Sequence, residues 1–65
     1  MTTTRMKVER KRRGWNQTEL AAKVGMSAAD ISRIESGRTV PYPSQAERLA
    51  KVLKIASAKL QDQVA

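Results

Sequence analysis

The chain has 65 residues, and its 13 Lys and Arg against six Asp and Glu give a formal net charge of +7. It contains no cysteine and no histidine, which excludes disulfides, thiolate metal sites and the commonest general base. A chain of this length forms one small domain, residues 1–65, with no room for a second core. The excess of positive charge favours a polyanionic partner.

Several other classes of protein find no support in the sequence. The N-terminal run MTTTRMK lacks the apolar segment of a secretory signal, and no apolar run approaches the ~20 residues that span a bilayer. No nucleophile–base pair, P-loop or dinucleotide glycine pattern occurs. We therefore expect a cytoplasmic protein that is not an enzyme, with no cofactor, no metal ion and no small-molecule ligand.

The first predicted helix covers residues 4–13 and ends at Gly14. Its apolar stripe is thin, with Met6 and Val8, and Trp15 is expected to fill the gap between this helix and the rest of the core. The helix carries a cluster of basic side chains, namely Arg5, Lys7, Arg10, Lys11, Arg12 and Arg13.

The next three helix starts are predicted from N-cap signatures, in which an acid follows a capping residue three positions later. The pairs are Asn16 with Glu19, Ser27 with Asp30, and Ser44 with Glu47. Apolar residues at helical spacing, Ala46, Leu49, Ala50 and Leu53, then give the fourth helix one buried face. A last short helix is predicted over residues 58–63, and no strand pattern is present.

The second and third helices, within residues 17–37, are predicted to form a helix-turn-helix. Gly25 supplies the positive φ of a sharp turn, and Ala21 is small where the helices cross. Ile31 and Ile34 define the inward side of the third helix. The expected fold is all-α, a compact bundle of about five short helices with this unit at its centre.

The runs RGWNQTELAAKVGMS and ISRIESGR resemble the bacteriophage repressor and Cro-like helix-turn-helix family of prokaryotic transcription regulators. The positions that carry the resemblance are Arg10, Gln17, Leu20, Ala21, Gly25, Ile31, Glu35 and Gly37. The resemblance implies a regulator that binds double-stranded DNA sequence-specifically, as a homodimer on a two-fold operator, with its third helix in the major groove. The chain departs from the family at Glu9, usually apolar, and at Lys54, often glycine.

The resemblance also assigns roles to residues of the helix-turn-helix. Base reading falls to Ala28, Ala29, Ser32 and Arg33, and Arg33 suits a guanine edge because its guanidinium donates two hydrogen bonds. Phosphate contacts are expected from Asn16, Gln17, Ser27 and Arg38, with Val40 and Tyr42 also near the backbone. Arg10 and Glu35 are expected to form a partly buried structural salt bridge.

The residues left outside the core suggest a dimer contact, and several biological roles are compatible with the family. The apolar residues least needed by the core, Ile55, Leu60 and Val64, are the expected dimer surface. Repressor, Cro-like switch and restriction-modification controller stay open, as does an antitoxin whose DNA binding is autoregulatory. A basic bundle on anionic membranes is disfavoured, because the first helix lacks a wide apolar face.

Overall fold

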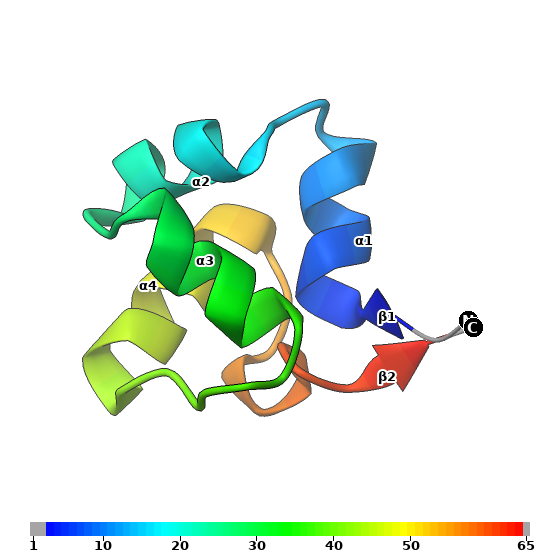
Figure 1. Ribbon diagram of the computed structural model, residues 1–65. Helices are drawn as coiled ribbons and strands as arrows, with labels where there is room; N and C mark the ends of the chain where they lie inside the picture. The colour runs from blue at the N-terminus through cyan, green and yellow to red at the C-terminus, as the bar shows by residue number, and fades with distance from the viewer. Residues whose placement is uncertain (1–2, 65) are drawn as a thin grey trace.

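A computed structural model describes residues 3–64 of the chain, and Figure 1 shows its helices packed around one core. The elements in chain order are β1 (Thr3–Thr4), α1 (Arg5–Arg12), α2 (Gln17–Val24), α3 (Ala28–Glu35), α4 (Pro43–Leu53), the short 3₁₀ turn η1 (Ser57–Lys59) and β2 (Gln63–Val64). The predicted all-α class with a central helix-turn-helix is confirmed. Within residues 3–64, no helix has both the length and the apolar character needed to cross a bilayer.

Every helix contributes to the core. Its buried apolar side chains are Met6, Leu20, Ala21, Val24, Ile31, Ile34, Leu49, Leu53 and Leu60. Trp15 packs half-buried against this cluster, as the sequence predicts, and the Nζ of Lys23 lies 4.6 Å from the centre of its ring. The aromatic face is therefore occupied within the protein itself.

Two of the three predicted helix starts are correct, and the third is wrong. Asn16 and Ser27 are the N-caps of α2 and α3, each accepting a hydrogen bond from a backbone amide of the first turn. The fourth helix begins at Pro43 rather than after Ser44, with Tyr42 as its N-cap. Proline suits the first helical position because its φ is preset and its missing N–H would have no intrahelical partner there.

The predicted C-terminal helix over residues 58–63 and the predicted absence of strands are both wrong. After η1 the chain extends, and β2 lies beside β1 (Figure 1). The two pair antiparallel, with Val64 opposite Thr3. The carbonyls of Leu60 and Asp62 accept hydrogen bonds, of 3.0 and 2.8 Å, from the amides of Met6 and Arg5. These amides open α1 and have no intrahelical acceptor, so the end of the chain satisfies them.

The predicted dimer contact at Leu60 is also wrong. Its side chain is only 1% exposed and belongs to the core, beneath the turn that joins η1 to β2. It therefore offers no surface to a partner. Ile55 and Val64, the other two predicted dimer residues, are half-buried.

Glu9 is buried although it carries a charge, and two arginines of the same helical turn explain this. The Nη1 of Arg13 lies 2.8 Å from its carboxylate, and the Nη1 of Arg12 lies 3.1 Å from it. The hydrogen bond from Arg13 and the charges of both arginines lower the pKa of Glu9, although burial opposes them. A paired carboxylate thus replaces the apolar residue usual at this position in the family.

Lys54 ends α4 in the left-handed conformation, with φ 58° and ψ 43°. Its amide donates to the carbonyl of Ala50, which closes the last turn. An L-residue in this conformation costs roughly 1–2 kcal/mol, whereas glycine adopts it without a Cβ penalty.

We expect Lys54→Gly to raise the free energy of unfolding by about 0.5–1 kcal/mol, because relief of the backbone strain exceeds the added entropy of the unfolded chain. Urea unfolding followed by Trp15 fluorescence measures the change. Lys54→Ala is the matched control, since it removes the same side chain and retains the Cβ. Equal gains from both substitutions would show that the side chain, and not the backbone conformation, is the source of strain.

Candidate nucleic-acid interface

The turn at Gly25 sets the position of α3 against α2. Gly25 has φ 69° and ends α2, and the amide of Met26 donates to the carbonyl of Ala21 at 2.9 Å. The Nη1 of Arg48, in α4, donates to the carbonyl of Val24 at 3.2 Å and lies 3.2 Å from the place that a Cβ of residue 25 would occupy. The left-handed backbone conformation favours glycine here, and a Cβ would also displace the arginine that caps α2 by a few tenths of an ångström.

The third helix has one buried side and one open side. Ile31 and Ile34 are 0% and 2% exposed and face the core. The residues expected to read bases lie away from this side: Ala29, Ser32 and Arg33 are exposed, and Ala28 is half-buried. Short side chains at positions 28, 29 and 32 leave most of the open side of α3 free for close approach by a large ligand.

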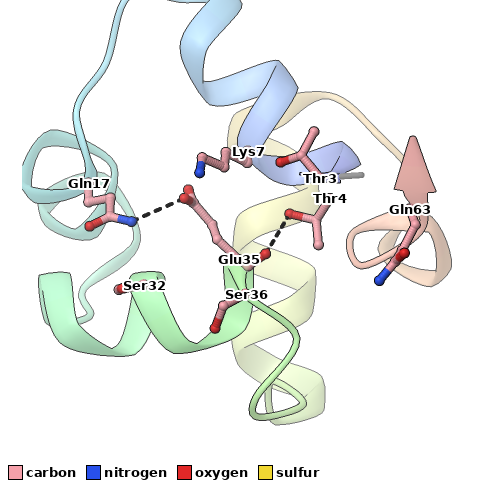
Figure 2. Close-up of a pocket in the computed structure, with 8 residues that line it drawn as sticks. All are labelled: Thr3, Thr4, Lys7, Gln17, Ser32, Glu35, Ser36 and Gln63. Atoms are coloured by element: carbon pink, nitrogen blue, oxygen red, sulfur yellow. Dashed lines mark hydrogen bonds between the residues drawn. The ribbon is translucent and has the colours of Figure 1, made fainter. Parts of the chain in front are cut away.

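A buried carboxylate joins α1, α2 and α3. Arg10 donates from Nε to Oε2 of Glu35 at 2.6 Å and from Nη2 to Oε1 at 3.1 Å, and both side chains are almost fully buried. The remaining Nη1 of Arg10 donates to the carbonyl of Trp15 at 2.7 Å. The amide Nε2 of Gln17 also donates to Oε1 of Glu35, at 3.1 Å (Figure 2). The expected Arg10–Glu35 salt bridge is therefore present, and Gln17 joins it.

Of the residues expected to contact phosphate, Asn16 and Ser27 already form hydrogen bonds within the protein. Asn16 accepts from the amide of Glu19 at 2.7 Å, and the carboxylate of Glu19 accepts from the amide of Asn16 at 2.9 Å, so its oxygen serves the cap. Ser27 Oγ likewise accepts from the amide of Asp30 at 3.1 Å. Gln17 is half-buried in the first turn of α2, and Arg38 is exposed just after α3.

A polar hollow of about 210 Å³ lies between the start of α1, the start of α2 and the open side of α3 (Figure 2). Its lining is Thr3, Thr4, Lys7, Gln17, Ser32, Glu35, Ser36 and Gln63. Lys7 and Ser36 are not among the residues that the sequence assigns to the site. Two features of the sequence could have predicted them. Lys7 belongs to the basic cluster of the first helix, and Ser36 has an outward position on the third helix.

The last carbonyls of α3 are satisfied by side chains from the two ends of the described chain. Thr4 Oγ1 donates to the carbonyl of Glu35 at 2.9 Å, as Figure 2 shows. Gln61 Nε2 donates to the carbonyl of Ile34 at 3.1 Å and to that of Thr39 at 2.6 Å. These bonds hold the end of α3 and the following loop to the β1–β2 region.

The loop between α3 and α4 exposes two large apolar side chains. Val40 is 80% and Tyr42 is 73% exposed. With Asp30, Arg33 and Gln45 they border a second shallow hollow beside α3. The loop therefore extends the open side of α3 toward the start of α4.

Comparison with known proteins identifies the unit. Residues 4–63 match the sequence profile of the helix-turn-helix domain family. The chain belongs to this family. Among solved structures, it is similar to the crystal structure of the P22 c2 repressor protein in complex with synthetic operator 9T in the presence of Tl⁺. The TM-score is 0.83 and the identity 29%, over 89% of this chain and 88% of that chain. The predicted phage-repressor-like family is thus confirmed, and no curated protein sequence matches the chain significantly.

We expect Arg10→Met to lower the free energy of unfolding by about 3–5 kcal/mol, because it leaves the Glu35 carboxylate buried without its cation. That is a large share of the ~5–15 kcal/mol that stabilises a domain. The double variant Arg10→Met/Glu35→Leu should unfold at higher urea than Arg10→Met, since no uncompensated charge remains.

Arg12→Met is the matched control for this prediction. It removes an ion pair with a buried carboxylate, but the Arg12 side chain is 71% exposed, and such pairs contribute below about 1 kcal/mol. A double variant no more stable than Arg10→Met would mean that the lost bonds to Trp15 and Gln17, and not the buried charge, dominate.

Proposed function

We propose that the chain is a transcription regulator that binds double-stranded DNA with α3 in the major groove. The observation that carries the proposal is the open side of α3, which is held by a buried network against the start of α2. The P22 c2 repressor, a protein with a similar fold, has been crystallised in complex with a synthetic operator. The net charge of +7 supplies the attraction to a polyanion.

In this proposal Arg33 supplies the main base contact. It is the longest hydrogen-bonding side chain on the open side of α3, and an arginine fork fits the O6 and N7 acceptors of guanine. Ala28 and Ala29 allow α3 to sit close to the base edges and suit a thymine methyl. Ser32 contributes a hydroxyl that both donates and accepts.

Phosphates are bound from the rim of the groove. The start of α2 offers free backbone amides and the positive end of the helix dipole. Gln17 has a second N–H on the amide nitrogen that donates to Glu35. This N–H has no acceptor among residues 3–64, so we assign it to a phosphate oxygen. Arg38, and Lys7 at the polar hollow, provide charge on either side, while Asn16 and Ser27 contribute around their capping bonds.

The protein is proposed to act as a homodimer on an inverted operator. A single recognition helix contacts few base pairs, and pairing two copies is the usual route to useful specificity. With Leu60 committed to the core, Ile55 and Val64 are the remaining C-terminal apolar residues for the contact. The proposed role is that of a repressor or Cro-like switch.

Binding should fall steeply with salt. If a dimer neutralises about six phosphates, log K should change with log salt at a slope near −5. Fluorescence anisotropy on labelled duplexes at several salt concentrations measures this slope. A flat titration between low and physiological salt would contradict the DNA-binding proposal.

Substitutions in the interface should separate two kinds of contact. Gln17→Ala and Arg38→Ala should weaken binding to all sequences alike, because phosphates carry no sequence information. Arg33→Ala should lose about 1–3 kcal/mol at particular base pairs of an operator obtained by selection from randomised duplexes. Lys51→Ala, in the last turn of α4, is the matched control for loss of one charge. If Arg33→Ala leaves the ratio of operator to random binding unchanged, the assignment of Arg33 is wrong.

The dimer proposal predicts inverted half-sites centred about ten base pairs apart, with the two α3 helices ~34 Å apart. Ile55→Lys should reduce cooperative occupation of the full site while binding to one half-site is retained. Thermal unfolding controls for the part of Ile55 that packs on the core. A variant that folds normally and fills both half-sites cooperatively would place the contact elsewhere, with the loop over residues 39–43 as the next candidate.

A further inference from the structure

We infer that Asp30 is a positioning residue that sets the base preference of α3 by holding the guanidinium of Arg33. The inference rests on the proposed DNA-binding function and adds a residue that the family resemblance does not assign to base reading. It concerns how the protein chooses among sequences, and not whether it binds DNA.

The geometry places the two side chains together on the open side of α3. Arg33 Nη2 donates to Asp30 Oδ1 at 2.5 Å, one helical turn away. The side chains are 49% and 40% exposed, so the pair is accessible to a ligand that lies along the helix. Nε and Nη1 of Arg33 donate to no residue within the described range 3–64, so they stay free for a base edge.

The carboxylate of Asp30 is itself held in place. Asp30 lies in the first turn of α3, where the helix dipole favours a negative charge. A hydrogen bond with Ser27 and then the one from Arg33 hold the pKa of Asp30 below its ordinary value. The group is therefore ionised at neutral pH and acts as a fixed acceptor for Arg33.

Fixing an arginine before binding changes what the arginine can do. A free arginine side chain samples many rotamers and reaches phosphates as readily as bases. When one edge of the guanidinium is bonded to Asp30, the remaining donors point in a restricted set of directions. A guanidinium held in this way favours the base pair whose acceptors lie in those directions, because the arginine loses less conformational entropy when it binds that base pair.

The charge of Asp30 acts in the same direction. A carboxylate on a surface that approaches DNA repels phosphates of every sequence, so it weakens random binding. The matched guanine contact offsets this repulsion only at the correct site. The ion pair itself contributes little to folding, because it is exposed and has i,i+3 spacing. The position of Asp30 in the first turn also stabilises α3, so the experiment must separate the two roles.

The test compares single and double variants on three duplexes. These are the selected operator, the same operator changed at the base pair where Arg33→Ala loses specificity, and a random duplex. Dissociation constants are measured for wild type, Asp30→Ala, Arg33→Ala and the double variant. Asp30→Ala should bind the random duplex several-fold tighter and lose roughly tenfold in discrimination at that base pair. In the Arg33→Ala background, Asp30→Ala should cause no further loss of discrimination.

Two further variants separate positioning from other roles. Asp30→Glu, which keeps the carboxylate, should restore part of the discrimination. Glu47→Ala, which removes an exposed acid from α4, should leave discrimination unchanged and measures the effect of net charge alone. Thermal unfolding of Asp30→Ala should differ little from wild type, because the N-cap bond of Ser27 is made to the backbone amide of residue 30.

Each remaining outcome overturns the inference in a distinguishable way. Unchanged discrimination in Asp30→Ala means that Asp30 does not orient Arg33. An equal loss with and without Arg33 means that Asp30 reads a base itself, for example a cytosine amino group. Both results leave the proposed function intact. If the wild-type protein shows no salt-dependent DNA binding, the proposed function and this inference fail together.

Discussion

The buried ion pair of Glu35 with Arg10 is the interaction on which the position of α3 depends. The Glu35 carboxylate lies in the last turn of α3, where the helix dipole disfavours a negative charge, and it is held there by two hydrogen bonds from Arg10 and one from Gln17. The same arginine also binds the carbonyl of Trp15. One ion pair thus fixes α1, the loop after it, the start of α2 and the end of α3 together. The proposed phosphate ligand Gln17 and the proposed reading helix are therefore set by the same group.

Residues near both ends of the described chain bind the C-terminal end of α3. The last carbonyls of an α-helix need partners from outside it, and Thr4 and Gln61 donate to those of Glu35 and Ile34. Both donors adjoin or belong to the region where β1 pairs with β2. The short sheet contributes little burial of its own, but it holds these two donors beneath α3. Residues 3–4 and 61–64 are thus part of the framework that holds the proposed interface.

The limits of prediction from sequence follow from the range of the interactions involved. Asn16 and Ser27 mark helix starts correctly because a cap bonds to an amide three residues away. The C-terminal segment is mispredicted because its carbonyls bond to Arg5 and Met6, at the far end of the chain. The burial of Leu60 follows from that contact. The pair of Arg10 with Glu35, on different helices and 25 residues apart, was accessible only through resemblance to a family. The i,i+3 spacing of Asp30 and Arg33 predicts their ion pair. An acid in the first turn of a helix also has a capping role, however, so the sequence alone does not single out the pair.

The distribution of acidic side chains connects stability with the charged surface. Glu9 pairs with Arg12 of α1 and with Arg13 just after it, Glu35 is buried with Arg10, and Glu19 closes the cap of α2. Glu9 and Glu35 are paired with arginines, so they offer little repulsion to an approaching polyanion, whereas Glu19 is bonded to a neutral amide and stays exposed. Asp30 is different, because its charge stays at the open side of α3 and is shared with Arg33. A carboxylate on the side of α3 proposed to face DNA lowers the affinity for DNA of any sequence. It is an advantage only if the protein must distinguish one DNA sequence from another. If the proposed function holds, this arrangement of charge favours selection among DNA sequences over maximal attraction to all of them.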